Sequence, residues 1–134
     1  MNIENVSELE ERLSRPSDAV VSAMKAIDGD IFILGAGGKM GPSLAKLARR
    51  AADLAGIPRR IVAVSRFCNG HLPAELSAQG VETMTCDLLE PGSLSRLPEM
   101  PNLIFMAARK FGTSGDEHLT WAMNTYLAAR TKSE

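Results

Sequence analysis

A run of four apolar residues followed at once by a glycine-rich turn constrains this chain more than any other feature. Residues 31–34 read Ile-Phe-Ile-Leu, and residues 35–41 read Gly-Ala-Gly-Gly-Lys-Met-Gly. An apolar run without alternation is typical of a parallel strand that is covered on both faces. The glycines fit a tight turn where the backbone comes close to a ligand, because glycine has no Cβ. We therefore expect a strand, a close turn and a helix in direct succession.

The remaining pattern alternates strands with helices. Further strands are expected at 61–64, 81–86 and 103–107, helices at 42–55, 73–78 and 116–130, and one helical turn near 93–97. Such alternation predicts an α/β fold with a parallel sheet and right-handed crossovers. The expected architecture is a Rossmann-like doubly wound parallel sheet, partial, with strand order 3-2-1-4 and helices on both faces.

The 134 residues divide into a helical extension, residues 1–28, and one domain, residues 29–134. Ser7 and Glu10 stand at the spacing of a capping box, so the first helix of the extension is expected to open there and to stop near Pro16. The second helix places four apolar side chains on one face, those of Val20, Val21, Met24 and Ile27.

Composition narrows the possible partners and the compartment. The chain has 15 basic and 16 acidic side chains, so its charge favours neither nucleic acid nor an anionic membrane. It has no apolar stretch long enough to cross a bilayer and no signal sequence at its start, which predicts a cytoplasmic protein. Cys68 and Cys86 lack metal-site spacing and are expected to be buried, reduced thiols, while His71 and His118 are expected at the surface. No metal site is predicted.

The glycine turn is the candidate binding site. Gly35, Gly38 and Gly41 have the spacing G-x-x-G-x-x-G, and Gly37 also permits a G-x-G pattern. A turn of this kind brings backbone N–H groups and the positive end of a helix to a pyrophosphate. Two more residues of the turn, Lys39 and Met40, are counted with this cofactor site, although a solvated lysine is the simpler interpretation of Lys39. The alternative for the whole motif is a structural strand-to-helix turn.

From about Asp30 to Arg130, the ordered motifs resemble the amino-terminal half of the extended short-chain dehydrogenases/reductases, the NAD-dependent epimerase/dehydratase family. The resemblance implies that the glycines carry the cofactor's pyrophosphate. It also implies that Asp87, followed by Leu88, accepts a hydrogen bond from the adenine amine. The remaining cofactor-binding residues that it implies are Ala107 and Ala108, which wall the cofactor, and Asn124 on the following helix.

The end of the second expected strand bears on cofactor choice. Where an acidic residue would hold the ribose hydroxyls of NAD, the chain has Ser65 and Arg66. A hydroxyl beside a guanidinium suits a 2′-phosphate, which gives a slight preference for NADP over NAD. The alternatives are that Arg66 stacks on adenine or faces solvent.

Catalytic residues are the main departure from the family. Its catalytic Ser or Thr and its Tyr-x-x-x-Lys have no match, since Tyr126 is followed at the fourth position by Arg130. The resemblance therefore implies an NAD(P)-binding domain truncated before its catalytic half. It would belong to an epimerase, dehydratase or reductase that acts on a nucleotide-sugar or related substrate by hydride transfer, and it would be inactive alone. The alternative is a non-catalytic module that senses a dinucleotide.

A sheet of this order leaves its fourth strand at an edge. Residues 103–107 carry no charged side chain to discourage pairing with another chain. We therefore expect either a homodimer through this edge or its burial by the helices of residues 1–28.

Overall fold

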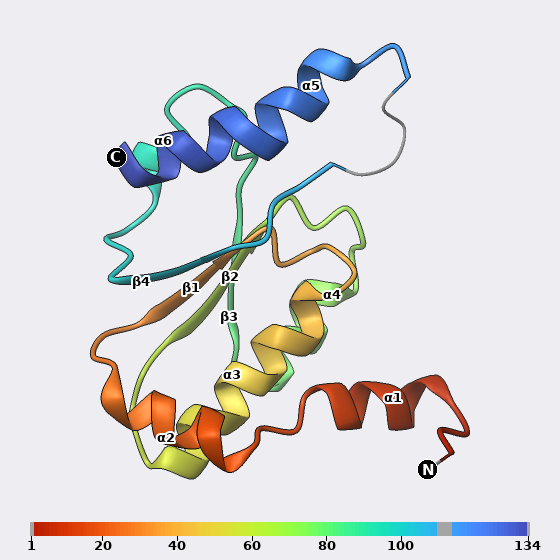
Figure 1. Ribbon diagram of the computed structural model, residues 1–134, viewed down its shortest axis with the longest axis vertical. Coiled ribbons are helices and arrows are strands. Elements are labelled where there is room, and N and C mark those ends of the chain that lie inside the picture. Colours follow the sequence, from red (N-terminus) through yellow and green to blue (C-terminus); the bar gives the residue numbers. More distant parts are fainter. Residues whose placement is uncertain (1, 110–113, 134) are drawn as a thin grey trace.

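Four parallel strands form a single sheet in the expected order. The computed structural model describes residues 2–109 and 114–133. Within them the sheet has the order β3-β2-β1-β4 (Figure 1). The strands are β1 (Ile31–Leu34), β2 (Ile61–Ser65), β3 (Glu82–Thr85) and β4 (Asn102–Phe105). The α/β class and the order 3-2-1-4 are confirmed, although β3 and β4 are shorter than predicted.

Strand β1 lies at the centre of the structure and is buried along its whole length. It pairs in parallel with β2 on one side and with β4 on the other, so that Ile33 lies opposite Ala63 and Ile104. Side chains alternate along a strand, and those of β1 therefore enter two different cores. Ile31 and Ile33 belong to one hydrophobic cluster, whereas Phe32 and Leu34 belong to the other.

Helices cover both faces of the sheet (Figure 1). The first cluster is closed by α2 (Asp18–Ala26), α3 (Gly41–Ala55) and α4 (Leu72–Ala78). The second lies under the 3₁₀ turn η1 (Leu94–Arg96) and a carboxyl-terminal helical segment, which consists of α5 (Glu117–Trp121), η2 (Ala122–Tyr126) and α6 (Leu127–Ser133). In the described part of the chain, no helix combines the length and the apolar character needed to cross a membrane.

The extension contains two helices, as predicted, but the first begins earlier than its capping box suggests. Helix α1 (Val6–Leu13) has Asn5 as its N-cap, and the Oδ1 of Asn5 accepts a hydrogen bond of 2.9 Å from the N–H of Glu8. Asn is as good an N-cap as Ser, so the earlier residue replaces Ser7 in this role. Both helices pack against α3, and Met24 of α2 is buried in the first cluster. Helix α2 thus shares the core of the sheet.

The carboxyl-terminal helical segment departs from a regular α-helix at η2, which is a π-helical turn. A π turn holds more residues than an α turn, so it rotates the following side chains relative to the expected face. Leu127 is fully buried, whereas Tyr126 is exposed with Arg130 5.9 Å from its ring centroid. The π turn thus leaves Tyr126 at the surface directly before the buried Leu127.

The segment that enters β1 is held from both neighbouring strands. Arg59, buried just before β2, donates from Nη2 to the carbonyl of Ile27 at 2.6 Å. Asn102, at the start of β4, donates from Nδ2 to the carbonyls of Asp28 and Asp30, at 2.6 and 3.1 Å. These bonds fix where β1 begins relative to both of its partners.

Strand β4 forms one edge of the sheet. Helices α1 and α2 pack chiefly against α3, and Ile104 of β4 remains exposed. Helices α1 and α2 therefore do not bury the β4 edge, contrary to the second of the two expectations.

The close packing of the glycine turn makes a prediction about stability. A Cβ on Gly41 would lie 2.2 Å from the carbonyl oxygen of Ala36, whereas a Cβ on Gly70 would meet nothing within 4 Å. We expect Gly41→Ala to lower the free energy of unfolding by about 1–3 kcal/mol or more, because backbone must move. Gly70→Ala is the matched control and should change it by less than about 0.5 kcal/mol. Urea denaturation measures both, and equal stabilities of the two variants would contradict the packing described.

Candidate functional site

A crevice of about 380 Å³ opens at the carboxyl ends of the strands. Residues that end or follow all four strands line it, and it spans the point between β1 and β4 where the strand order reverses. Ligands of open α/β sheets bind at such a point. The sequence-predicted residues that line the crevice are Gly35, Gly37, Gly38, Ser65, Arg66, Asp87, Leu88, Ala107 and Ala108.

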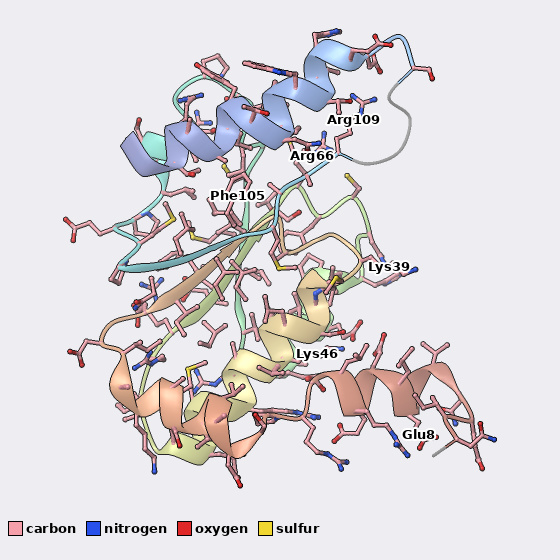
Figure 2. All side chains as sticks on the ribbon, viewed as in Figure 1. Glu8, Lys39, Lys46, Arg66, Phe105 and Arg109 are labelled. Atoms are coloured by element: carbon pink, nitrogen blue, oxygen red, sulfur yellow. The ribbon has the colours of Figure 1, made fainter. Side chains whose placement is uncertain are left out.

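The other four predicted residues lie outside the lining. Gly41 is buried beneath the turn, while Lys39 and Met40 are exposed beside it, and Figure 2 shows Lys39 pointing away from the protein. Asn124 instead holds the backbone after β4: it accepts from the N–H of Arg109 at 2.8 Å and donates to its carbonyl at 3.1 Å. Asn124 therefore binds the backbone segment that follows β4, and its side chain does not line the crevice.

Two of the four glycines, Gly35 and Gly41, are required by the packing of the protein's own backbone. Gly35 has a φ of +83°, and a Cβ there would lie 2.4 Å from the backbone nitrogen of Ala107. A Cβ on Gly41 would meet the backbone of Ala36, whereas a Cβ on Gly37 would lie 2.5 Å from Oγ of Ser65, a hydroxyl that can rotate away. At Gly38 the nearest atom to a Cβ would be the carbonyl oxygen of Gly35, at an ordinary contact distance of 3.5 Å. The fold thus gives no steric reason for glycine at 38.

The backbone N–H groups of the turn fall into two sets. Gly35 donates to the carbonyl of Val64 at 2.8 Å, and Gly38 and Gly41 donate to carbonyls within the turn, at 3.2 and 3.3 Å. Among the residues that the structure describes, the N–H groups of Gly37, Lys39 and Met40 have no acceptor. Free N–H groups next to the start of a helix attract anions. The motif glycines shape the turn, and the residues between them carry the free donors.

The ends of β2 and β3 contribute charge to the crevice. Arg66 is exposed and makes no ion pair with any described residue. Asp87 accepts a hydrogen bond of 3.0 Å from the N–H of Leu89 through Oδ1, so this carboxylate caps the turn after β3. Its other oxygen, Oδ2, has no hydrogen bond from the described residues. An adenine contact and the cap are therefore compatible.

A second pocket continues the crevice under the carboxyl-terminal helical segment. Arg66 and Asp87 line both spaces, and Arg109, which pairs with Asp116 at 2.9 Å, lines the second. Figure 2 shows Arg66 and Arg109 near one another below this segment. Two guanidinium groups thus lie beside the crevice, and within the described part of the chain only that of Arg109 has a carboxylate partner.

Sequence reasoning missed six lining residues, namely Phe67, Cys68, Asn69, Cys86, Met106 and Met123. Five of them follow a strand end within four residues, which is the signal that points to them. Phe67 has a φ of +47°, an uncommon conformation for a bulky residue, and its side chain is buried. Met123 lies four residues after Leu119 and four before the buried Leu127, and this helical spacing is the signal that points to it.

The cysteines differ from their prediction as buried thiols. Cys68 is exposed, because β2 ends at Ser65 and the left-handed backbone at Phe67 directs the chain outward. Cys86 is half-buried, with its Sγ 4.0 Å from the carbonyl oxygen of Ser93. Burial raises the pKa of the Cys86 thiol above its ordinary value.

The two thiols should therefore react at different rates. The thiolate is the reactive form of cysteine, and both burial and a raised pKa lower its availability at Cys86. We expect iodoacetamide at neutral pH to alkylate Cys68 several-fold faster than Cys86. Mass spectrometry of the modified peptides over time measures this ratio, and faster labelling of Cys86 would contradict the exposure described.

Comparison with known proteins gives no match to the chain, whether with protein-family models, with curated proteins or with solved structures. The interpretation of the crevice therefore depends on its own geometry and on the order of the motifs.

Proposed function

We propose that this chain binds a dinucleotide, NADP or NAD, in the crevice at the carboxyl ends of the strands. The observation that carries the proposal is the glycine at position 38, which the packing of the fold does not require. A side chain there would occupy the space next to the free N–H groups of Gly37, Lys39 and Met40. A ligand that brings a pyrophosphate close to the backbone explains the missing side chain.

The proposal orients the ligand along the crevice. The pyrophosphate accepts hydrogen bonds from the glycine turn at the start of α3, where the helix dipole favours an anion. The adenosine lies toward the ends of β2 and β3, where Oδ2 of Asp87 accepts from the adenine amine and Leu88 contacts the ring. The nicotinamide extends past Ala107 and Ala108, the small residues after β4.

Arg66 gives NADP the slight advantage. It follows β2, where a dinucleotide's adenosine ribose would lie, and no carboxylate stands there to hold two ribose hydroxyls. The exposed guanidinium of Arg66, which pairs with no carboxylate of the described residues, and the hydroxyl of Ser65 together suit a 2′-phosphate.

The reaction that the family resemblance favours is hydride transfer in an epimerase, dehydratase or reductase acting on a nucleotide-sugar or related substrate. A bound nicotinamide supplies the hydride acceptor or donor. By itself, we expect this chain to bind the cofactor without turnover, since it lacks the Tyr-x-x-x-Lys pair and Tyr126 does not line the crevice.

One observation favours the second candidate, a non-catalytic dinucleotide sensor. Among the described residues, the ionisable ones that line the crevice are Arg66, Asp87, Cys68 and Cys86, and none of these is a tyrosine, lysine or histidine suited to proton transfer at an alcohol. Both candidates require the same cofactor pocket. Hydride transfer by the isolated chain, followed by the absorbance of the reduced nicotinamide, would contradict both.

The central test is a substitution at the unexplained glycine. We expect Gly38→Val to remove binding of NADP and NAD in calorimetric titration, because the branched side chain blocks the approach of the pyrophosphate. Its circular dichroism and urea midpoint should stay close to those of the wild type, since a Cβ fits at this position. Gly70→Val, also on an open surface, is the matched control and should bind normally. Undiminished affinity in a folded Gly38→Val variant would overturn the proposed site.

A second test separates the two cofactors. A charge-assisted hydrogen bond contributes about 1.5–3 kcal/mol, or roughly one to two decades of affinity. We therefore expect Arg66→Ala to weaken NADP by that amount and NAD much less. Arg15→Ala, which removes an exposed guanidinium on the extension, is the control for a change in net charge. Equal losses for NADP and NAD would instead assign Arg66 to adenine stacking.

A further inference from the structure

Two guanidinium groups from different strand ends meet at the second pocket, which has a volume of about 790 Å³. Arg66 follows β2 and Arg109 follows β4, and both line this space beneath the carboxyl-terminal helical segment (Figure 2). Strands β2 and β4 are separated in the sheet by β1, so the fold and not the sequence brings the two cations together. Because the pocket shares Arg66 and Asp87 with the crevice, one ligand can occupy both spaces.

The main chain of Arg109 is held in place, whereas its side chain makes an ion pair that is easily exchanged. Both the N–H and the carbonyl of Arg109 bind the side chain of Asn124, which lies in the π turn η2. Turns of this kind are frequent at functional sites. The guanidinium pairs with Asp116, and their side chains are 27% and 47% exposed. An ion pair that stays in contact with water contributes little to stability, so breaking it costs little.

The acidic side chains that line the second pocket are engaged on its β3 side. Oδ1 of Asp87 accepts from the N–H of Leu89 at 3.0 Å, and Glu90 pairs with Arg96 at 3.0 Å. Both carboxylates follow β3, so they disfavour a ligand phosphate on that side of the pocket. The two guanidinium groups lie at the ends of β2 and β4 instead, and a phosphate is favoured there.

We propose that Arg109 is a second specificity-determining residue for the 2′-phosphate of NADP, and that it exchanges Asp116 for this phosphate when NADP binds. The inference rests on the dinucleotide site proposed above, in which the adenosine lies toward the ends of β2 and β3. A phosphate monoester carries more charge than a carboxylate and has three acceptor oxygens, so it is the stronger partner for a guanidinium. Arg66 and Arg109 then hold the phosphate together. NAD has no phosphate at this position, and with NAD bound Arg109 keeps its pair with Asp116.

Calorimetric titration of the full chain with NADP and with NAD tests the exchange. We expect Arg109→Ala to weaken NADP about tenfold and NAD by less than about twofold. Asp116→Asn should strengthen NADP about threefold and leave NAD unchanged, because it removes the carboxylate that competes with the phosphate. A variant that merely loses structure does not gain affinity. Glu117→Gln is the matched control, since it removes the neighbouring charge of a residue that accepts from the N–H of Gly115, and both affinities should stay near those of the wild type.

A double variant tests whether the two guanidinium groups hold the same phosphate. Arg66→Ala combined with Arg109→Ala should bind NADP no more tightly than NAD. A double variant that still prefers NADP would overturn the inference, and so would equal losses of NADP and NAD in Arg109→Ala. An Asp116→Asn variant that binds NADP more weakly would also reject the exchange. These three results leave the proposed dinucleotide site intact, whereas a wild-type chain that binds neither cofactor would reject that site and this inference with it.

Discussion

The close approach of Gly35 to Ala107 is the contact on which the site depends. It joins the turn after β1 to the segment after β4, and a side chain on Gly35 would push these backbones apart. Because the strand order reverses here, the helices that follow the two strands leave on opposite faces of the sheet. The crevice is the space left between them. Its floor is therefore fixed by backbone, while its charges come from residues after β2 and β3.

Strong local patterns allowed the fold to be predicted from the sequence. The four apolar residues of β1 predicted a central strand buried on both faces, and the alternation of strands and helices predicted the order of the sheet. The glycine turn predicted where the crevice lies. In each case a local pattern and the packing of the whole domain favour the same structure, which is the condition under which sequence reasoning succeeds.

The predictions failed where a single backbone conformation redirects several side chains. The left-handed conformation of Phe67 places Cys68 at the surface. This conformation is uncommon for a bulky residue, so the sequence does not predict it. The π turn η2 leaves Tyr126 exposed directly before the buried Leu127. Asn124 lies in the same turn, and its hydrogen bonds go to the backbone of Arg109. Such local departures from regular geometry depend on tertiary packing, so propensity and periodicity do not reveal them.

The bonds that hold the segment before β1 have a consequence for how the chain tolerates changes in length. Arg59 and Asn102 bind carbonyls of residues 27–30 from opposite sides. These hydrogen bonds fix the length of this short connection. One inserted residue that slides β1 along its partners would exchange the faces of its side chains. Phe32 and Leu34 would then enter the cluster built for Ile31 and Ile33, and the glycine turn would begin one residue out of phase with β4. Insertions between homologous chains should therefore avoid this loop, even though it lies at the surface.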